Sequence, residues 1–201
     1  MNAMNKPGFS AKTPGGSFKF HGRLSFPSLL EGKEMEPGKI KYEVTILLPP
    51  ETDLAPYRRE MERVWIENFG NDPKKWPKGP SVRTPDKVIR DCTEKAYSGY
   101  EEGWHFIALR SNKAPQVVGP QRGPDGRFAL ITDTSEVYPG RWANVTGSAY
   151  CYTFPTTGIT WGLNNVQLLK HDTPFGGVGP RAENEFEDVA EEMDDEGNPL
   201  G

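Results

Sequence analysis

The chain has 201 residues, of which 35% are hydrophobic and 26% charged, and its formal net charge is −4 at pH 7. This length suits one domain with a proper core and is short for two. No apolar run reaches the roughly 18 residues of a membrane span, and no apolar stretch near the start is typical of a secretory signal. Because its two cysteines, Cys92 and Cys151, are too few for a disulfide framework, a reduced, cytoplasmic setting is the simplest interpretation.

Charge is distributed unevenly along the chain. Residues 182–201 contain nine Asp and Glu side chains and no Lys or Arg, whereas residues 1–181 contain 24 basic and 19 acidic side chains, a net charge of +5. A mildly basic body followed by a strongly acidic tail suggests that the body has an anionic partner.

The first half of the chain predicts a flexible arm, two strands and one helix. Residues 1–16 are polar and rich in proline and glycine, and we expect them to form the arm. Residues 17–26 alternate phenylalanine with polar side chains, and residues 40–48 alternate still more regularly, so both segments predict strands. Two prolines end the second strand.

The helix is expected between residues 54 and 68. Thr52 or Asp53 can cap its start, and Gly70 can end it. A Pro/Lys-rich loop, residues 71–87, follows. The positions at helical spacing that should form the buried face are Leu54, Tyr57, Met61, Val64, Trp65 and Asn68.

The second half is richer in strands, which we expect at residues 104–110, 115–118, 141–154 and 159–170. Five or more strands with a single helix favour a mainly β fold, a five-stranded OB-type antiparallel barrel, although a β-sandwich is an alternative. The expected organisation is a flexible arm at 1–16, an OB domain at 17–177 and a disordered acidic tail at 178–201.

The strand expected at 141–154 has two dissimilar faces. One carries the small residues from Ala143 to Cys151, and the other carries aromatic and hydrogen-bonding side chains from Trp142 to Phe154. A tight barrel interior accepts small side chains, which leaves the aromatic face for base stacking. The inverse arrangement, with the aromatic residues in the core, fits the periodicity equally well.

Segment 90–118 interleaves basic and aromatic residues, a pattern that backbone tracking and base stacking on single-stranded nucleic acid require. For each residue taken singly, ordinary surface charge or core packing is the commoner role. The candidate contacts, here and on the strand at 141–154, are Arg90, Lys95, Tyr97, Tyr100, Trp104, Phe106, Arg110, Lys113, Arg141, Trp142, Tyr150 and Tyr152.

Catalytic and metal-binding signatures are poor, so we expect a binding protein without cofactor or metal. The three histidines are isolated, the two cysteines lack metal-ligand spacing, and no nucleophile elbow or phosphate-binding loop is present. The enzymatic alternative is a metal-dependent nuclease or recombination factor. It would need ordered carboxylates in the body, for example Asp86, Asp91 or Asp133.

The acidic tail could compete with nucleic acid for a basic groove, because attachment gives it a high local concentration. It could instead simply increase solubility. Its apolar residues, which could anchor a partner protein, are Phe186, Val189, Met193 and Leu200.

Three blocks of the sequence resemble phage-encoded single-stranded DNA-binding proteins, relatives of the T7-type replication protein. The resemblance runs from about Phe18 to Gly177 and is most specific in the block from Arg90 to Pro115 and in the run GLNNVQ at 162–167. It implies an OB fold, sequence-tolerant binding of single-stranded DNA in phage replication and recombination, and an acidic tail that contacts replication proteins. The tail departs from this pattern because it ends in Asn-Pro-Leu-Gly rather than in an aromatic residue. An RNA-binding OB module is the remaining alternative, since only contacts with the 2′-hydroxyl separate the two.

Overall fold

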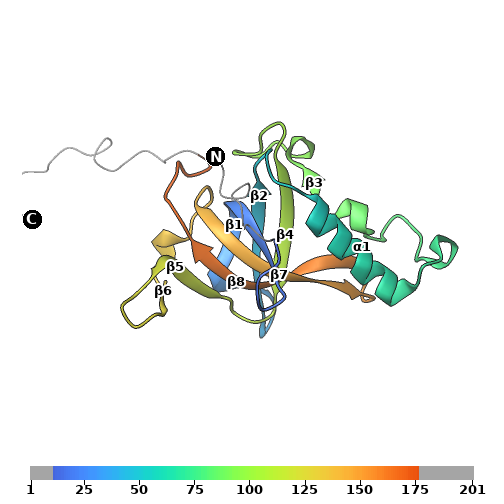
Figure 1. The fold of residues 1–201 in the computed structure, drawn as a ribbon, viewed down its shortest axis with the longest axis horizontal. Coiled ribbons are helices and arrows are strands. Elements are labelled where there is room, and N and C mark those ends of the chain that lie inside the picture. The colour runs from blue at the N-terminus through green and yellow to red at the C-terminus, as the bar shows by residue number, and fades with distance from the viewer. Residues whose placement is uncertain (1–10, 177–201) are drawn as a thin grey trace, which may run out of the picture.

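The computed structural model describes residues 11–176 (Figure 1). Eight strands and one α-helix form its regular structure, together with four short 3₁₀ turns. In chain order these elements are β1 (Phe18–Glu36), β2 (Lys39–Leu48), α1 (Ala55–Phe69), η2 (Pro73–Lys75), η3 (Pro85–Lys87), β3 (Arg90–Asp91), η4 (Cys92–Glu94), β4 (His105–Ser111), β5 (Gln116–Arg122), β6 (Phe128–Leu130), η5 (Thr134–Glu136), β7 (Trp142–Tyr152) and β8 (Gly158–Leu168).

Five of the strands close into a barrel. Strands β4, β2, β1, β7 and β8 pair antiparallel in this order, and β8 then pairs with β4 in parallel, with Leu109 opposite Trp161. This is the strand arrangement of an OB-fold. The predicted five-stranded OB-type barrel with one helix is therefore confirmed, with the closing pair parallel, and closure excludes the sandwich alternative.

The small-residue face of β7 lies inside the barrel. Ala143 and Val145 are fully buried, whereas Tyr150 on the other face is exposed. A Cβ atom at Gly147 would lie 2.5 Å from the carbonyl oxygen of Gly162 on β8, and one at Gly22 on β1 would overlap the carbonyl oxygen of Leu47 on β2. These strands approach too closely for any side chain, which is the geometry that small residues allow in a narrow barrel.

Helix α1 covers part of the barrel beside β7 (Figure 1). Its buried residues are four of the six predicted, Tyr57, Met61, Val64 and Trp65, and Tyr57 stacks on Phe20 of β1 with ring centroids 4.7 Å apart. The helix begins at Ala55, whose amide donates to the Asp53 carboxylate at 2.9 Å. It ends as predicted at Gly70, which has a φ of +79°.

Three features differ from the predicted elements. Strand β1 does not end at residue 26 but continues to Glu36, because it bends at Phe26, whose φ is +47°, and shifts register on either side of Ser28. Strands β5 and β6 extend the sheet beyond the barrel, since β5 pairs in parallel with the second half of β8. Residues 11–16, expected within the flexible arm, fold back on β1, where the Lys19 amide donates to the Ala11 carbonyl at 2.7 Å.

No helix within residues 11–176 is long and apolar enough to cross a membrane. The acidic tail, with its proposed anchors Phe186, Val189, Met193 and Leu200, lies outside the described residues, as do residues 1–10.

Candidate nucleic-acid interface

A groove with a volume of about 840 Å³ lies on the outer face of β2 and β4. We call it the β2–β4 groove. Its floor is low because Thr45 and Ala108, which face each other in the β2–β4 register, both have small side chains. The segment 80–90 and the loop 94–100 form its walls. The residues that line it are Phe26, Lys33, Glu43, Val44, Thr45, Pro80, Ser81, Val82, Arg83, Asp86, Lys87, Ile89, Arg90, Glu94, Lys95, Tyr97, Tyr100, Phe106, Ala108 and Arg110.

Aromatic rings line one end of the groove. Phe26 packs edge-on against Tyr97 with centroids 5.2 Å apart, Tyr97 packs edge-on against Tyr100 at 5.3 Å, and Tyr100 contacts Phe106 at 5.4 Å. Phe26 and Tyr97 are about half exposed, whereas Phe106 is buried. The row thus offers two accessible rings supported from behind by two others, which is suited to stacking of unpaired bases.

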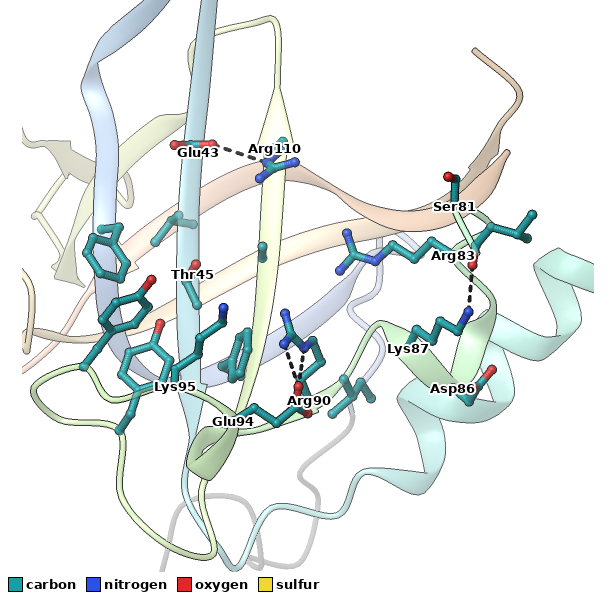
Figure 2. Close-up of a pocket in the computed structure, with 18 of the residues that line it drawn as sticks. Glu43, Thr45, Ser81, Arg83, Asp86, Lys87, Arg90, Glu94, Lys95 and Arg110 are labelled. Carbon is teal, nitrogen blue, oxygen red and sulfur yellow. Dashed lines mark hydrogen bonds and ion pairs between the residues drawn. The ribbon is translucent and has the colours of Figure 1, made fainter. Parts of the chain in front are cut away.

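Arginines converge at the other end. Figure 2 shows Arg83 extending from its loop toward β4, where Arg110 lies, and toward Arg90. Partial burial lowers the pKa of Arg83, and the nearby charges of Arg110 and Arg90 lower it further, while Tyr152 acts in the opposite direction. Within residues 11–176, the Arg83 guanidinium forms no ion pair with a carboxylate and donates no hydrogen bond. Three cations held close together, one of them unpaired, form a site for an anion such as phosphate.

Arg83 is fixed in place by its backbone. Its amide donates to the Thr157 carbonyl at 3.2 Å, and its carbonyl accepts from the Ile159 amide at 3.0 Å. The segment therefore joins the start of β8 like a short extra strand, which directs the side chain over the groove.

Acidic side chains in the groove partly neutralise the cations. The Glu43 carboxylate accepts from Lys33 Nζ at 2.8 Å and lies 3.3 Å from Arg110 Nε, and the hydrogen bond from Lys33 is the main cause of its lowered pKa. Glu94 accepts from Arg90 at 2.6 Å and also has a lowered pKa, for which Arg90 is the main cause. Six basic and three acidic residues line the groove in total, so a net positive charge remains.

A second hollow of about 330 Å³, the side pocket, continues from the groove because Arg83 and Arg110 line both. It lies beside the β7–β8 loop, where Phe154 is 87% exposed. Together the two hollows form a track with aromatic residues at both ends and arginines between them. The residues that line the side pocket are Lys41, Arg83, Arg110, Ser111, Asn112, Tyr150, Tyr152, Phe154, Pro155 and Thr160.

A comparison with protein-family models matches residues 20–197 to the family described as "Enterobacter phage Enc34, ssDNA-binding protein". The chain belongs to this family. A comparison with curated protein sequences gave no match.

Solved structures of the Enc34 protein have the same fold. Its C-terminally truncated form aligns with a TM-score of 0.60 at 21% identity, over 81% of this chain and 90% of that one. The Enc34 protein in complex with ssDNA aligns with a TM-score of 0.59 at 21% identity, over 81% and 91%. A further structure of the Enc34 protein gives 0.59 at 20% identity, over 87% and 92%.

In this member of the Enc34 family, the structure brings many of the predicted contact residues together. Arg110 lies in both hollows and links them. Of the other candidates, the β2–β4 groove contains Arg90, Lys95, Tyr97, Tyr100 and Phe106, and the side pocket contains Tyr150 and Tyr152.

Four predicted residues lie elsewhere. Arg141 is 5% exposed and binds Glu136 at 2.6 Å and the Leu169 carbonyl at 3.0 Å. Its guanidinium is therefore paired inside the fold and does not face a DNA strand. Trp104 and Trp142 contact each other at a centroid distance of 6.3 Å and line neither hollow. Lys113 is exposed in the loop between β4 and β5 and also lines neither.

Sequence reasoning missed several residues of the track, namely Phe26, Lys33, Lys41, Arg83, Lys87 and Phe154. The Pro/Lys-rich composition of 71–87 is the available signal for Arg83 and Lys87, but composition alone predicts only a loop. Phe154 belongs to the aromatic face predicted at 141–154 for base stacking, although it is not among the named candidate contacts. For Phe26, an outward position followed only from the bend in β1.

The carboxylates of the nuclease alternative have other roles. Asp91 caps η4 and Asp133 caps η5, and hydrogen bonds from Thr93 and Ser135, respectively, lower their pKa values. Asp86 lies at the edge of the groove. Within residues 11–176, no group of three His, Cys, Asp or Glu side chains is arranged to hold a metal ion.

Proposed function

We propose that this protein binds single-stranded DNA without sequence preference, in phage DNA replication and recombination, in the cytoplasm of the infected cell. The observation that carries this proposal is the β2–β4 groove, in which two accessible aromatic rings lie at one end and the three arginines Arg83, Arg90 and Arg110 lie beyond them, with Arg90 over the Phe106 ring. Strands β2 and β4 are the second and third barrel strands in chain order, and in OB-folds the face of these two strands usually binds the ligand.

The two ends of the groove would contact different parts of the DNA strand. Phosphates lie between Arg83, Arg90 and Arg110, while bases stack on Phe26 and Tyr97, each stack contributing about 1–3 kcal/mol. Every base has a stacking face, so this mode tolerates any sequence. In a duplex the same faces are covered by neighbouring base pairs, so the groove favours unpaired strands.

The acidic tail, residues 182–201, has two roles in this proposal. Its nine carboxylates compete weakly with DNA for the arginines, and its apolar residues Phe186, Val189, Met193 and Leu200 recruit replication proteins. Its charge pattern and its covalent attachment to a basic domain support both roles.

The decisive experiment measures binding of the full chain to oligo-dT and to duplex DNA of equal length, over a range of salt concentrations. Oligo-dT should bind far more tightly, and the logarithm of its affinity should fall with log salt by about 0.7 per neutralised phosphate. Arg83→Gln should lower affinity and make this slope shallower by about 0.7. Arg59→Gln is the matched control, because Arg59 is exposed on α1 and lines neither hollow.

Equal affinity for duplex and single strand would disprove the proposal. Tighter binding of oligo-U than of oligo-dT would favour an RNA-binding module, and oligonucleotide cleavage that depends on added Mg²⁺ or Mn²⁺ would favour the nuclease. For the tail, deletion of residues 182–201 should raise affinity at low salt and not at a few tenths molar salt, where charges are screened.

A further inference from the structure

The last described segment, residues 172–176, contacts the loop that carries Tyr97 and Tyr100. The Gly176 amide donates to Ser98 Oγ at 3.0 Å, and the Phe175 amide donates to the Pro139 carbonyl at 3.0 Å. The segment therefore joins the aromatic loop to the turn before β7, two regions that are distant in sequence.

Phe175 is the side chain through which this segment contacts the loop. Its ring lies against Gly99, so closely that a Cβ atom there would overlap three ring carbons. Gly99 also has a φ of +80°, a conformation that side chains other than glycine rarely adopt. The ring also packs against the small apolar cluster of Leu47 on β2, Phe106 on β4 and Cys92 in η4.

Arg23 of β1 lies over the face of the Phe175 ring. Its guanidinium carbon lies 4.3 Å from the centroid of the Phe175 ring, within the range of a cation–π contact. The same side chain donates to the Gly140 carbonyl at 2.8 Å and to the Thr173 carbonyl at 2.6 Å. Phe175 thus contacts both a well-anchored arginine and the Gly99 backbone.

Gly99 and Ser98 lie directly between Tyr97 and Tyr100, the two tyrosines of the aromatic row. A loop held at its midpoint by a fixed ring keeps both tyrosines in one position before DNA arrives, which reduces the entropy lost on binding. We propose that Phe175 is a positioning residue for two tyrosines of the β2–β4 groove: Tyr97, on which a base stacks, and Tyr100, which supports it. This inference rests on the proposed function.

The test compares Phe175→Ala with the unchanged protein, using oligo-dT and an abasic oligonucleotide of equal length. Phe175→Ala should weaken oligo-dT binding by about three- to tenfold, a part of one stacking contribution. Binding of the abasic strand should change much less, because Arg83 and Arg110 contact neither this loop nor Phe175, and Arg90 is also held by its ion pair with Glu94. In a protein that also carries Tyr97→Ala and Tyr100→Ala, the Phe175 substitution should have no further effect.

Two further variants separate positioning from stability. Phe69→Ala removes another half-buried phenyl group, which packs on Trp65 far from the groove, and should lower the melting temperature without changing affinity. Phe175→Leu keeps an apolar side chain, folds if Phe175→Ala does not, and should weaken oligo-dT binding by about twofold, again mainly when bases are present.

The outcomes distinguish the two proposals. If the unchanged protein does not prefer oligo-dT to duplex, the proposed function fails. If it does, the positioning role is overturned by a Phe175 variant that binds oligo-dT normally. It is also overturned by an equal loss for the abasic strand, or by a full additional loss in the double-tyrosine background.

Discussion

Glu43 on β2 and Arg110 on β4 occupy opposite positions in the β2–β4 register, with Oε2 of the carboxylate 3.3 Å from Arg110 Nε. The same carboxylate accepts a hydrogen bond from Lys33 at 2.8 Å. One acidic side chain therefore reduces the positive potential from two of the six basic residues in the groove.

Glu43→Gln should consequently strengthen oligo-dT binding, by about two- to fivefold at low salt, and the gain should shrink as salt is raised. Because the pKa of Glu43 is lowered, its carboxylate is fully ionised from pH 6 to pH 8 and the gain should be constant over this range. Glu60→Gln is the control, since Glu60 pairs with Arg63 on α1, far from the groove. Unchanged or weaker binding by Glu43→Gln would show that this carboxylate does not oppose the DNA.

The small floor of the groove gives a second prediction. Ala108 lies on the outer face of β4, so Ala108→Trp would fill the groove without entering the barrel core. Oligo-dT affinity should fall by at least about tenfold, the equivalent of one lost stacking or phosphate contact, with little change in the melting temperature. Ala129→Trp on the exposed edge strand β6 should change neither. Normal binding by Ala108→Trp would place the DNA elsewhere on the protein.

The close approach of β1 and β2 predicts a large effect on folding. Gly22→Ala would bring its Cβ atom onto the Leu47 carbonyl oxygen, a backbone atom that cannot move aside, and should lower the free energy of unfolding by about 3 kcal/mol or more. Gly119→Ala is the matched control, because its neighbours lie at ordinary contact distances of 3.9 Å. Chemical denaturation of the two variants measures the difference, and similar stabilities would contradict the observed strand packing.

The two thiols should react slowly in the folded protein. Burial raises the pKa of Cys92 to about 12, so at pH 8 only about one thiol in 10,000 is ionised, and burial also raises the pKa of Cys151. Iodoacetamide at pH 8 should leave both unmodified over a time in which guanidinium-unfolded protein is fully alkylated. Rapid modification of Cys92 in the folded protein would show that the loop 92–104 opens readily.

The local sequence pattern was sufficient to predict most strands of the barrel and the helix. The alternation at 40–48 identified Val44, Ile46 and Leu48 as buried, and the helical spacing did the same for Tyr57, Met61 and Trp65, because each element packs one face on a single core. Ile40, on the same predicted face, is exposed because it lies at the end of β2 beyond the core, and Leu47 is buried on the opposite face. The two faces of β7 were also identified, but periodicity is symmetrical and could not show which of them lies inside. Barrel closure decides this, since only the small residues fit where β7 approaches β8.

Sequence patterns could predict a site residue only where neighbours in the same segment place it in the site. Tyr97 and Tyr100 lie in one basic and aromatic block and were recognised together. Arg83 reaches the groove through backbone hydrogen bonds to Thr157 and Ile159, more than 70 residues further along the chain, and no local signal encodes that contact. Arg141 shows the opposite error: its own segment predicts a DNA contact, but in the fold its guanidinium is buried and binds Glu136 and the Leu169 carbonyl.

The parallel contact between β4 and β8 has a consequence for synthesis of the protein on the ribosome. On the edge of β4 away from β2, β3 pairs with His105 and Phe106, but the other end of that edge stays unpaired until residues 158–168 have emerged and Leu109 has Trp161 opposite it. Such an edge can pair with another nascent chain, and contacts so distant in sequence form slowly. In the interval between translation of β4 and of β8 the chain is therefore exposed to aggregation through this open end of the barrel.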